Sequence, residues 1–377
     1  MPFSKGDILI LDQSINNIYS AVNKVLQKFK YFPQKQKICS DFLTGKLQIN
    51  KSPVAEKLAE RIAVFFQLNK DQKKAFKDAV SNTPVAAVQG PPGTGKTFLL
   101  AALVCYFTAC GQHVFITALS HFAINNALNK CAAFLKKIGS DIPVIKISRN
   151  KNRGLDRKVH IIDKVRNIPS FLKKECFVIG ATVYKARTDF NRGTDCVLIM
   201  DEASQISLPL GIMSMYFGSR YIFIGDHKQL APITNYNYHP PALKRSLFEH
   251  ITVYYGDRVA FLSITYRMNK ALTAIPSLFF YENRLKPDHS SAHSRLEITH
   301  GEDDIYDRVI SAQQPSVFAA VDHSYCGNYS VYEALFTAML IYKAVSVYRI
   351  KADEVAVLTP FRAQQELVRS LLHKLQH

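Results

Sequence analysis

The segment Gly90-Pro91-Pro92-Gly93-Thr94-Gly95-Lys96-Thr97 contains the residues of this chain best suited by type and spacing to chemistry. It follows the apolar run 85–88 and leads into the apolar run 98–103, so we expect a strand, a glycine-rich loop and a helix start. Glycines let backbone N–H groups point inward at phosphate oxygens, at the positive end of a helix. Lys96 would add a charge for the β- and γ-phosphates, and the Thr97 hydroxyl would ligate Mg²⁺. The pattern predicts a nucleoside triphosphate site, and an ordinary glycine-rich turn is the alternative.

Two adjacent carboxylates follow a second apolar run. Residues 197–200 are Val-Leu-Ile-Met, and Asp201 and Glu202 come directly after them. At a strand end the pleat points successive side chains in different directions. Asp201 can therefore hold Mg²⁺ while Glu202 polarises the attacking water. The alternative is an ordinary charged turn.

A third polar segment, Gly225-Asp226-His227-Lys228-Gln229, follows the apolar run 221–224. Asp226 and Gln229 would stand at another strand end, from which they could reach the γ-phosphate or its catalytic water. A Gly-Asp pair on its own is also a common turn.

The elements that position these residues follow from alternation along the chain. From Val85 onward, short apolar runs alternate with helical periodicity, which indicates a parallel α/β sheet covered on both faces. In such sheets ligands bind at the carboxyl ends of the strands. Residues 14–66 instead show helical periodicity, which predicts a helical stalk packed on the nucleotide domain or a free-standing bundle. The expected strands are 85–88, 114–118, 178–181, 197–200, 221–224 and 355–358.

Charge points to a polyanionic partner. The chain carries 48 Lys and Arg against 30 Asp and Glu, a formal net charge of +18. Such an excess is typical of nucleic-acid-binding proteins, although a generally basic surface is the alternative. The stretch 146–176 holds many of these cations and predicts a basic insertion, and 286–306 predicts a surface loop. His289, His293 and His300 in that loop are interpreted as solvated side chains rather than metal ligands.

The 7 cysteines are scattered without a CxxC pair, which favours reduced residues over a zinc or iron–sulfur site. The first residues lack a secretory layout, and no apolar run approaches the length of a membrane span. We therefore expect a soluble protein of the cytoplasm, or of the nucleus, with no membrane partner.

The order of the motifs GPPGTGKT, DEASQ, GDHKQLAP and then Tyr266-Arg267-Met268 resembles that of the superfamily 1 helicases. It is most similar to the 5′-to-3′ branch typified by the nonsense-mediated-decay helicase, over roughly residues 20–377. The resemblance implies an α/β fold of the P-loop NTPase class, with one RecA-like parallel sheet domain and a second RecA-like domain. It also implies ATP and Mg²⁺ as ligands, and movement on single-stranded RNA or DNA.

Further roles are implied by this resemblance. Gln72 would read the adenine edge, Tyr266 would stack on adenine, and Arg267 would reach the γ-phosphate. The sequence departs from the family pattern at Leu119 and His121 of the strand-contacting motif, and at Thr265. The residues implied to contact nucleic acid are Ser120, His121, Thr182, Thr359 and Pro360.

We expect a helical stalk at residues 1–66, a first RecA-like domain at 67–258 with the basic insertion, and a second RecA-like domain at 259–377. The second domain is expected to be incomplete, because the family's Gln-Gly motif and last Arg motif do not follow Gln364. The chain is then either a fragment or naturally short, and a partner chain or a C-terminal continuation would complete it.

Three functions remain in view. The first is an ATP-dependent helicase or translocase, and the second is a non-catalytic nucleic-acid-binding module switched by ATP. A small-molecule kinase is the third, but it explains neither Tyr266-Arg267 nor the segment 225–229.

Overall fold

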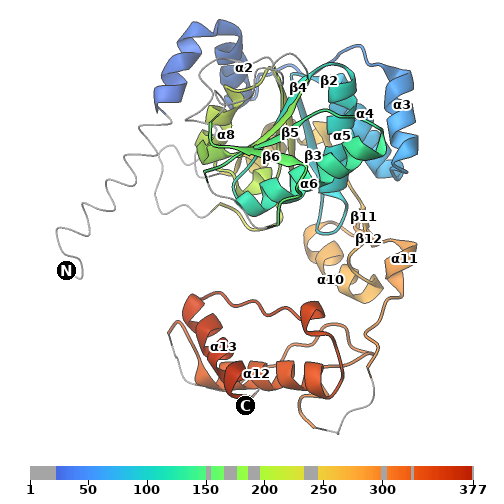
Figure 1. Ribbon diagram of the computed structural model, residues 1–377, viewed down its shortest axis with the longest axis vertical. Helices are drawn as coiled ribbons and strands as arrows, with labels where there is room; N and C mark the ends of the chain where they lie inside the picture. The colour runs from blue at the N-terminus through green and yellow to red at the C-terminus, as the bar shows by residue number, and fades with distance from the viewer. Residues whose placement is uncertain are drawn as a thin grey trace, which may run out of the picture. The chain divides into compact units, whose positions relative to one another are not determined.

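The structure is a computed structural model that describes residues 23–149, 154–164, 176–185, 196–232, 245–298, 304–323 and 327–375. The chain divides into two compact units, Met1–Thr265 (unit 1) and Tyr266–His377 (unit 2) (Figure 1). The division predicted from the sequence lies after residue 258. It comes later because residues 259–261 pair with the strand that precedes the glycine-rich loop.

Among its described residues, unit 1 is built on an eight-stranded sheet with the order β10-β3-β9-β8-β4-β7-β5-β6. All neighbouring strands in it are parallel. The central strands are short, apolar and rich in β-branched residues, as expected for a sheet buried on both faces. The strands are β3 (Val85–Gln89), β4 (His113–Ala118), β5 (Val144–Ile147), β6 (Val159–Ile162), β7 (Val178–Thr182), β8 (Cys196–Met200), β9 (Arg220–Gly225) and β10 (Val259–Phe261).

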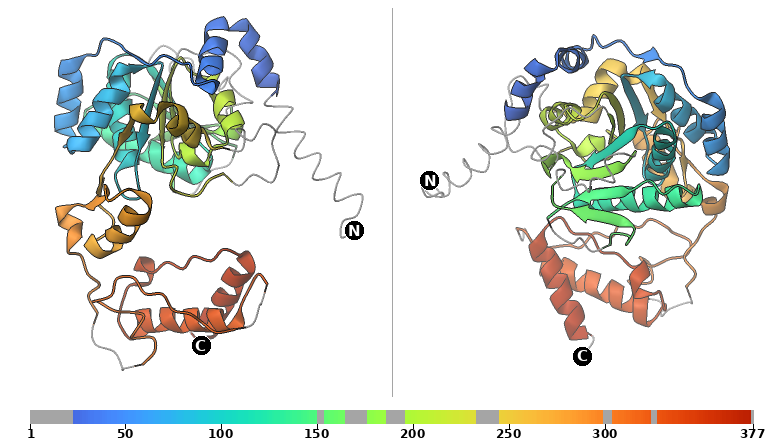
Figure 2. Two further views of the ribbon diagram at one scale, coloured as in Figure 1. Left: turned by 180° about the vertical axis from the view of Figure 1, so that it is seen from behind. Right: turned by 45° about the horizontal axis from the view of Figure 1, so that its top comes forward.

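Successive residues of each strand enter different hydrophobic cores. In β8, Ile199 packs into one core and Leu198 into the other. Figure 2 shows helices on both sides of the sheet. The core that contains Ile199 is covered by α3 (Glu56–Phe65), α4 (Lys70–Ser81), α5 (Lys96–Ala109) and α6 (His121–Lys137). The core that contains Leu198 is covered by α2 (Pro33–Leu43), α8 (Leu208–Met215) and α9 (Leu247–Tyr255).

The described part of residues 14–66 belongs to unit 1 and packs into the cores on both faces of its sheet. Phe42 of α2 is fully buried against Phe223 of the sheet and His250 of α9. The Tyr255 hydroxyl donates to the Asp41 carbonyl at 3.2 Å and accepts from the Leu47 N–H at 3.2 Å. On the other face, Phe66 stacks on Phe134 of α6. The described helices of this segment therefore cover the sheet and do not form a separate bundle. The short strands β1 (Asn50–Lys51) and β2 (Asn82–Thr83) pair antiparallel beside them.

Two expectations about the basic stretch and the last strand were wrong. β5 and β6 are strands of the main sheet, so 146–176 is not wholly an irregular insertion, and Lys146 is fully buried within β5. Residues 355–358 form no strand, and Leu358 is 95% exposed without a neighbouring strand among the described residues. An apolar run becomes a strand only where a ladder partner and a core are present.

In the described residues of unit 2 the regular structure is mainly helical, with α10 (Lys270–Phe280), α11 (His289–Ala292), α12 (Val331–Ser346), α13 (Arg362–Leu375) and the short strand β12 (Lys286–Pro287). The predicted surface loop 286–306 thus contains β12 and α11, and His300 lies outside the described residues. Gln364 of α13 binds both backbone groups of Ser330, the N-cap of α12. β11 (Ile264–Thr265) ends unit 1. No helix in the described ranges has the length and apolarity needed to cross a bilayer.

Candidate active site

The glycine-rich loop joins the end of β3 to the first residue of α5, as the sequence predicts. Gly93 and Gly95 have φ values of 76° and 83°, in the left-handed region that glycine adopts without strain. A Cβ on Gly90 would lie 2.4 Å from Cγ of Lys96, so a larger residue there would displace the Lys96 side chain. The Lys96 ammonium donates to the Gly90 carbonyl at 2.7 Å, which holds this cation at the mouth of the loop.

Three polar side chains hold the loop in shape. Thr94 Oγ1 donates to the Pro91 carbonyl at 2.8 Å, and Thr265 Oγ1 donates to the Pro92 carbonyl at 2.9 Å. Gln72 Nε2 donates to the Thr94 carbonyl at 3.1 Å. Gln72 is 4% exposed, and its Oε1 accepts from the Asn69 N–H in the capping box of α4. The structure thus gives Gln72 a bracing role, and its implied contact with adenine stays a prediction.

Asp201 and Glu202 follow β8 at the same edge of the sheet. Asp201 is 4% exposed, and its Oδ1 accepts from the Glu202 N–H at 3.0 Å. Burial, and then the negative charge of Glu202, raise the pKa of Asp201 to about 7, against the opposing effect of Lys96. Glu202 has a φ of 50°, a left-handed conformation that is costly for a residue with a Cβ. Its Oε2 is buried without a hydrogen-bond partner in the described part of the chain.

Asp226 links the third motif to the base of the loop. Its carboxylate, which is fully buried, accepts from Gln229 Nε2 at 2.9 Å and from Gln89 Nε2 at 3.0 Å. Gln89 is the last residue of β3, and the Gly90 N–H beside it donates to the Gly225 carbonyl at 3.0 Å. Gln229 is therefore held close to the start of the loop. Gln89 was not predicted, and Thr265 was noted only as a departure from the family pattern, because their roles depend on contacts between distant segments.

The predicted strand-contacting residues of unit 1 stand farther along the same edge. Ser120 caps α6, since its Oγ accepts from the Ala123 N–H at 3.1 Å. His121 is the first residue of that helix, and it is exposed. Thr182 ends β7 and is buried, with its Cα paired to that of Ala118. Ser120 and His121 follow β4, and Thr182 ends the neighbouring strand β7, so all three belong to one stretch of this edge.

Four predicted residues belong to unit 2. Tyr266 and Arg267 open it and are exposed, and Thr359 and Pro360 precede α13. Thr359 Oγ1 donates to the Phe361 carbonyl at 3.1 Å, a local turn contact. Their implied roles stay predictions.

Comparison with known proteins identifies the family to which this arrangement belongs. Residues 67–239 match one family described as an AAA domain, and residues 243–377 match another with the same description. The DNA replication ATP-dependent helicase/nuclease DNA2 of Gallus gallus is 24% identical over 392 residues, which cover 97% of this chain and 36% of that protein. These similarities support the superfamily 1 helicases as the family of this chain. The order of motifs predicted this family, and the prediction is confirmed.

Two more superfamily 1 relatives give the extent of the likeness. DNA2 of Bos taurus is 30% identical over 233 residues, covering 58% of this chain and 21% of that protein. The "Uncharacterized ATP-dependent helicase MJ0104" of Methanocaldococcus jannaschii is 26% identical over 399 residues, covering 81% and 59%. The chain thus spans less than two thirds of the length of these relatives. A solved complex of Arterivirus nonstructural protein 10 (helicase) with DNA matches at 18% identity and a TM-score of 0.38, covering 61% of this chain and 47% of that chain, which is too weak to bear on function.

The residues of this superfamily 1 site fit a divalent cation. Asp201 carries a buried carboxylate, Thr97 is the second residue of α5, and Glu202 Oε2 has no protein donor among the described residues. Carboxylate and hydroxyl oxygens are the ligands that Mg²⁺ prefers. The raised pKa of Asp201 is what a carboxylate shows when a nearby cation is needed to stabilise its charge. Asp201 and Thr97 are therefore the residues of this site whose oxygens fit a divalent cation.

Proposed function

We propose that this protein is an ATP-dependent helicase or translocase that couples ATP hydrolysis to movement on single-stranded nucleic acid. The observation that carries the proposal is the convergence of three motifs at one sheet edge. Lys96, the Asp201–Glu202 pair and the Asp226–Gln229 pair follow β3, β8 and β9, which are adjacent in the sheet.

Each of these groups has a role in hydrolysis. The loop N–H groups and Lys96 would bind the β- and γ-phosphates. Mg²⁺ held at Thr97 and Asp201 would neutralise charge on the phosphates. Glu202 would take a proton from the attacking water, because its unpartnered Oε2 is free to accept one. Gln229, fixed by Asp226, would orient that water.

Unit 2 would supply the remaining parts. By family likeness, Tyr266 would stack on adenine and Arg267 would stabilise charge on the transferring phosphoryl group.

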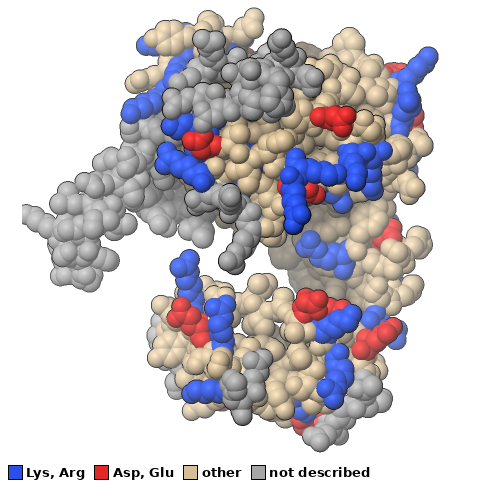
Figure 3. Space-filling view, in the orientation of Figure 1, with Lys and Arg blue, Asp and Glu red and all other residues tan. Residues whose placement is uncertain are grey.

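The charge of the chain supports nucleic acid as the partner. Beyond the net charge of +18, α6 and the turn before β6 carry Lys130, Lys136, Lys137 and Lys158. Figure 3 shows Lys and Arg side chains gathered on this part of unit 1. Backbone phosphates are the natural partners of such a surface. The described cysteines are all free, which supports a cytoplasmic or nuclear location.

The decisive experiment is duplex unwinding with an unpaired tail on one strand. We expect ATP-dependent strand separation by the full chain with a 5′ tail and none with a 3′ tail, using RNA and DNA versions of each. Lys96→Ala should abolish it. Strand binding without any ATP-dependent movement would instead favour the non-catalytic switch.

A further inference from the structure

Two exposed aromatic side chains follow neighbouring strands at the carboxyl edge of the unit 1 sheet. Phe122 is the second residue of α6 and is 75% exposed. Tyr184 comes two residues after the end of β7 and is 38% exposed. β4 and β7 are parallel, with Ala118 paired to Thr182, so both rings belong to one short stretch of the edge.

Phe122 does not contribute to the core that the rest of α6 builds. Ile124, Ala127 and Leu128 of the same helix are fully buried against the sheet. Phe122 precedes this face and lies beside the capping residue Ser120. A single exposed apolar residue is ordinary on protein surfaces, so the neighbourhood must decide whether this ring has a role.

That neighbourhood contains a buried positive charge with no acid beside it. Lys146 of β5 is fully buried, and its ammonium donates to Asn125 Oδ1 of α6. Burial lowers the pKa of Lys146 to about 8, and no carboxylate opposes the effect in the described residues. Partial burial, and then the charge of Lys146, lower the pKa of His121, which places that charge near the start of α6.

Backbone groups add to the positive character of this place. The N–H groups that open a helix have no partner within the helix. At α6, Ser120 Oγ takes the Ala123 N–H, while those of His121 and Phe122 have none in the described structure. Arg149 follows β5 at the same edge and is exposed. An aromatic ring beside a cation and free N–H groups suits a ligand with alternating bases and phosphates.

We propose that Phe122 is a base-stacking residue for single-stranded nucleic acid, with Tyr184 as a second stacking position on the neighbouring strand. The proposal rests on the strand-binding function proposed above and adds to it the residues that hold the bases. Because every base has a π face, this contact is independent of sequence. A protein partner would also cover an exposed ring, but the unbalanced charge of Lys146 and the net charge of +18 favour a polyanion.

The test compares strand affinity of full-chain variants by fluorescence anisotropy. The probes are labelled oligothymidylate and oligouridylate of about 16 nucleotides. We expect Phe122→Ala to weaken binding roughly tenfold to a hundredfold and Tyr184→Ala to weaken it less. Phe122→Trp should retain affinity, and Phe122→Leu should not. The salt dependence should stay unchanged in Phe122→Ala, because no phosphate contact is removed.

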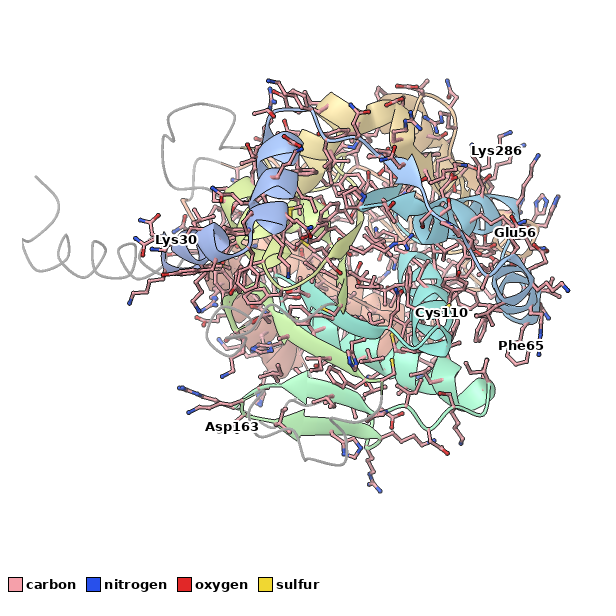
Figure 4. All side chains as sticks on the ribbon, turned by 90° about the horizontal axis from the view of Figure 1, so that it is seen from above. Lys30, Glu56, Phe65, Cys110, Asp163 and Lys286 are labelled. Atoms are coloured by element: carbon pink, nitrogen blue, oxygen red, sulfur yellow. The ribbon has the colours of Figure 1, made fainter. Side chains whose placement is uncertain are left out.

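Phe65→Ala is the matched control. Phe65 ends α3, is 55% exposed and lies on the opposite side of unit 1 from Asp163, which follows β6 (Figure 4). Its removal should leave strand affinity unchanged.

Three outcomes would overturn the proposal. If the wild-type chain binds strands and Phe122→Ala binds them equally well, stacking is wrong while the proposed function stands, and the ring belongs to another partner. If Phe122→Ala lowers the melting temperature more than Phe65→Ala does, its effect is structural. If the wild-type chain binds neither probe, the proposed function fails as well.

Discussion

Along the carboxyl edge of the unit 1 sheet, the half formed by β3, β9 and β8 differs from the half formed by β4, β7 and β5 in how its polar groups are held. In the first half, Asp226 is fully buried and accepts from two glutamines, and Asp201 accepts from a backbone N–H. In the second half, Lys146 is buried and donates to a single amide, that of Asn125, while the imidazole of His121 is exposed.

The two halves also bury opposite charges. Asp201 is the acid of the nucleotide half, and its pKa is raised to about 7. Lys146 is the buried cationic side chain of the other half, and its pKa is lowered to about 8. A divalent cation at the proposed nucleotide site would compensate the charge of Asp201. The difference teaches that chemistry needs side chains fixed in advance, whereas a strand of any sequence needs an accessible surface.

The largest effect should come from Glu202, the proposed catalytic base that follows β8. Glu202→Gln keeps the shape of the side chain but removes the proton acceptor, so ATP turnover should fall by about 10²–10⁴-fold while ATP affinity is retained. Steady-state hydrolysis and equilibrium nucleotide binding measure the two quantities. Unchanged turnover would show that Glu202 is not the base.

The second-largest effect should come from Lys96→Ala, which should weaken the binding of ATP. The variant removes the cation that now binds the Gly90 carbonyl, and we expect ATP affinity to fall by about tenfold to a hundredfold, the effect of losing one charge-assisted hydrogen bond. A fluorescent ATP analogue measures it. Lys136→Ala, at an exposed position of α6, is the control and should bind ATP as the wild type does.

The buried acid should leave a signature in the pH dependence of stability. The folded pKa of Asp201 is about 7, above the usual value of 3.8, so the folded state holds an extra proton between these values. This contribution to the free energy of unfolding is therefore fully present below about pH 4 and is lost as pH rises through 7, by at most about 1.4 kcal/mol per pH unit.

Melting temperatures of the wild type and Asp201→Asn should therefore diverge between pH 5 and 8, with only the wild type showing this fall. Mg²⁺ should reduce the fall, since it stabilises the ionised carboxylate. Parallel curves for the two proteins would contradict the burial assigned to Asp201.

The smallest effect should come from the packing beneath the half formed by β4, β7 and β5. A Cβ on Gly180 of β7 would lie 2.7 Å from Cδ1 of Leu128 in α6. Gly180→Ala should therefore lower the free energy of unfolding by about 1–3 kcal/mol. Gly256→Ala is the control, since a Cβ there meets nothing within 4 Å, and chemical denaturation should show a change below about 0.5 kcal/mol.

Much of the nucleotide half could be predicted from sequence because its signals are local. A strand, a glycine-rich loop and a helix follow one another within residues 85–109, and the acids follow a continuous apolar run. The half formed by β4, β7 and β5 was harder to predict from the sequence. Lys146 interrupts the apolar pattern of β5, so this strand was interpreted as part of a basic insertion, although its ammonium is buried.

The supporting roles of Gln89 and Thr265 depend on long-range contacts, so they could not be predicted for a different reason. Gln89 and Asp226 are 137 residues apart in sequence, and Thr265 meets Pro92 across 173 residues. Only the parallel order of the sheet brings them together. The expected strand at 355–358 failed in the opposite way, since its apolar residues have no ladder partner in the described chain.

The most direct test of the account is ATP hydrolysis by the full chain with and without saturating single-stranded RNA or DNA. The account predicts that a strand raises the wild-type rate at least tenfold, and that Glu202→Gln stays inactive in both conditions. A wild-type rate that neither strand changes would contradict the claim that one sheet edge couples ATP to nucleic acid.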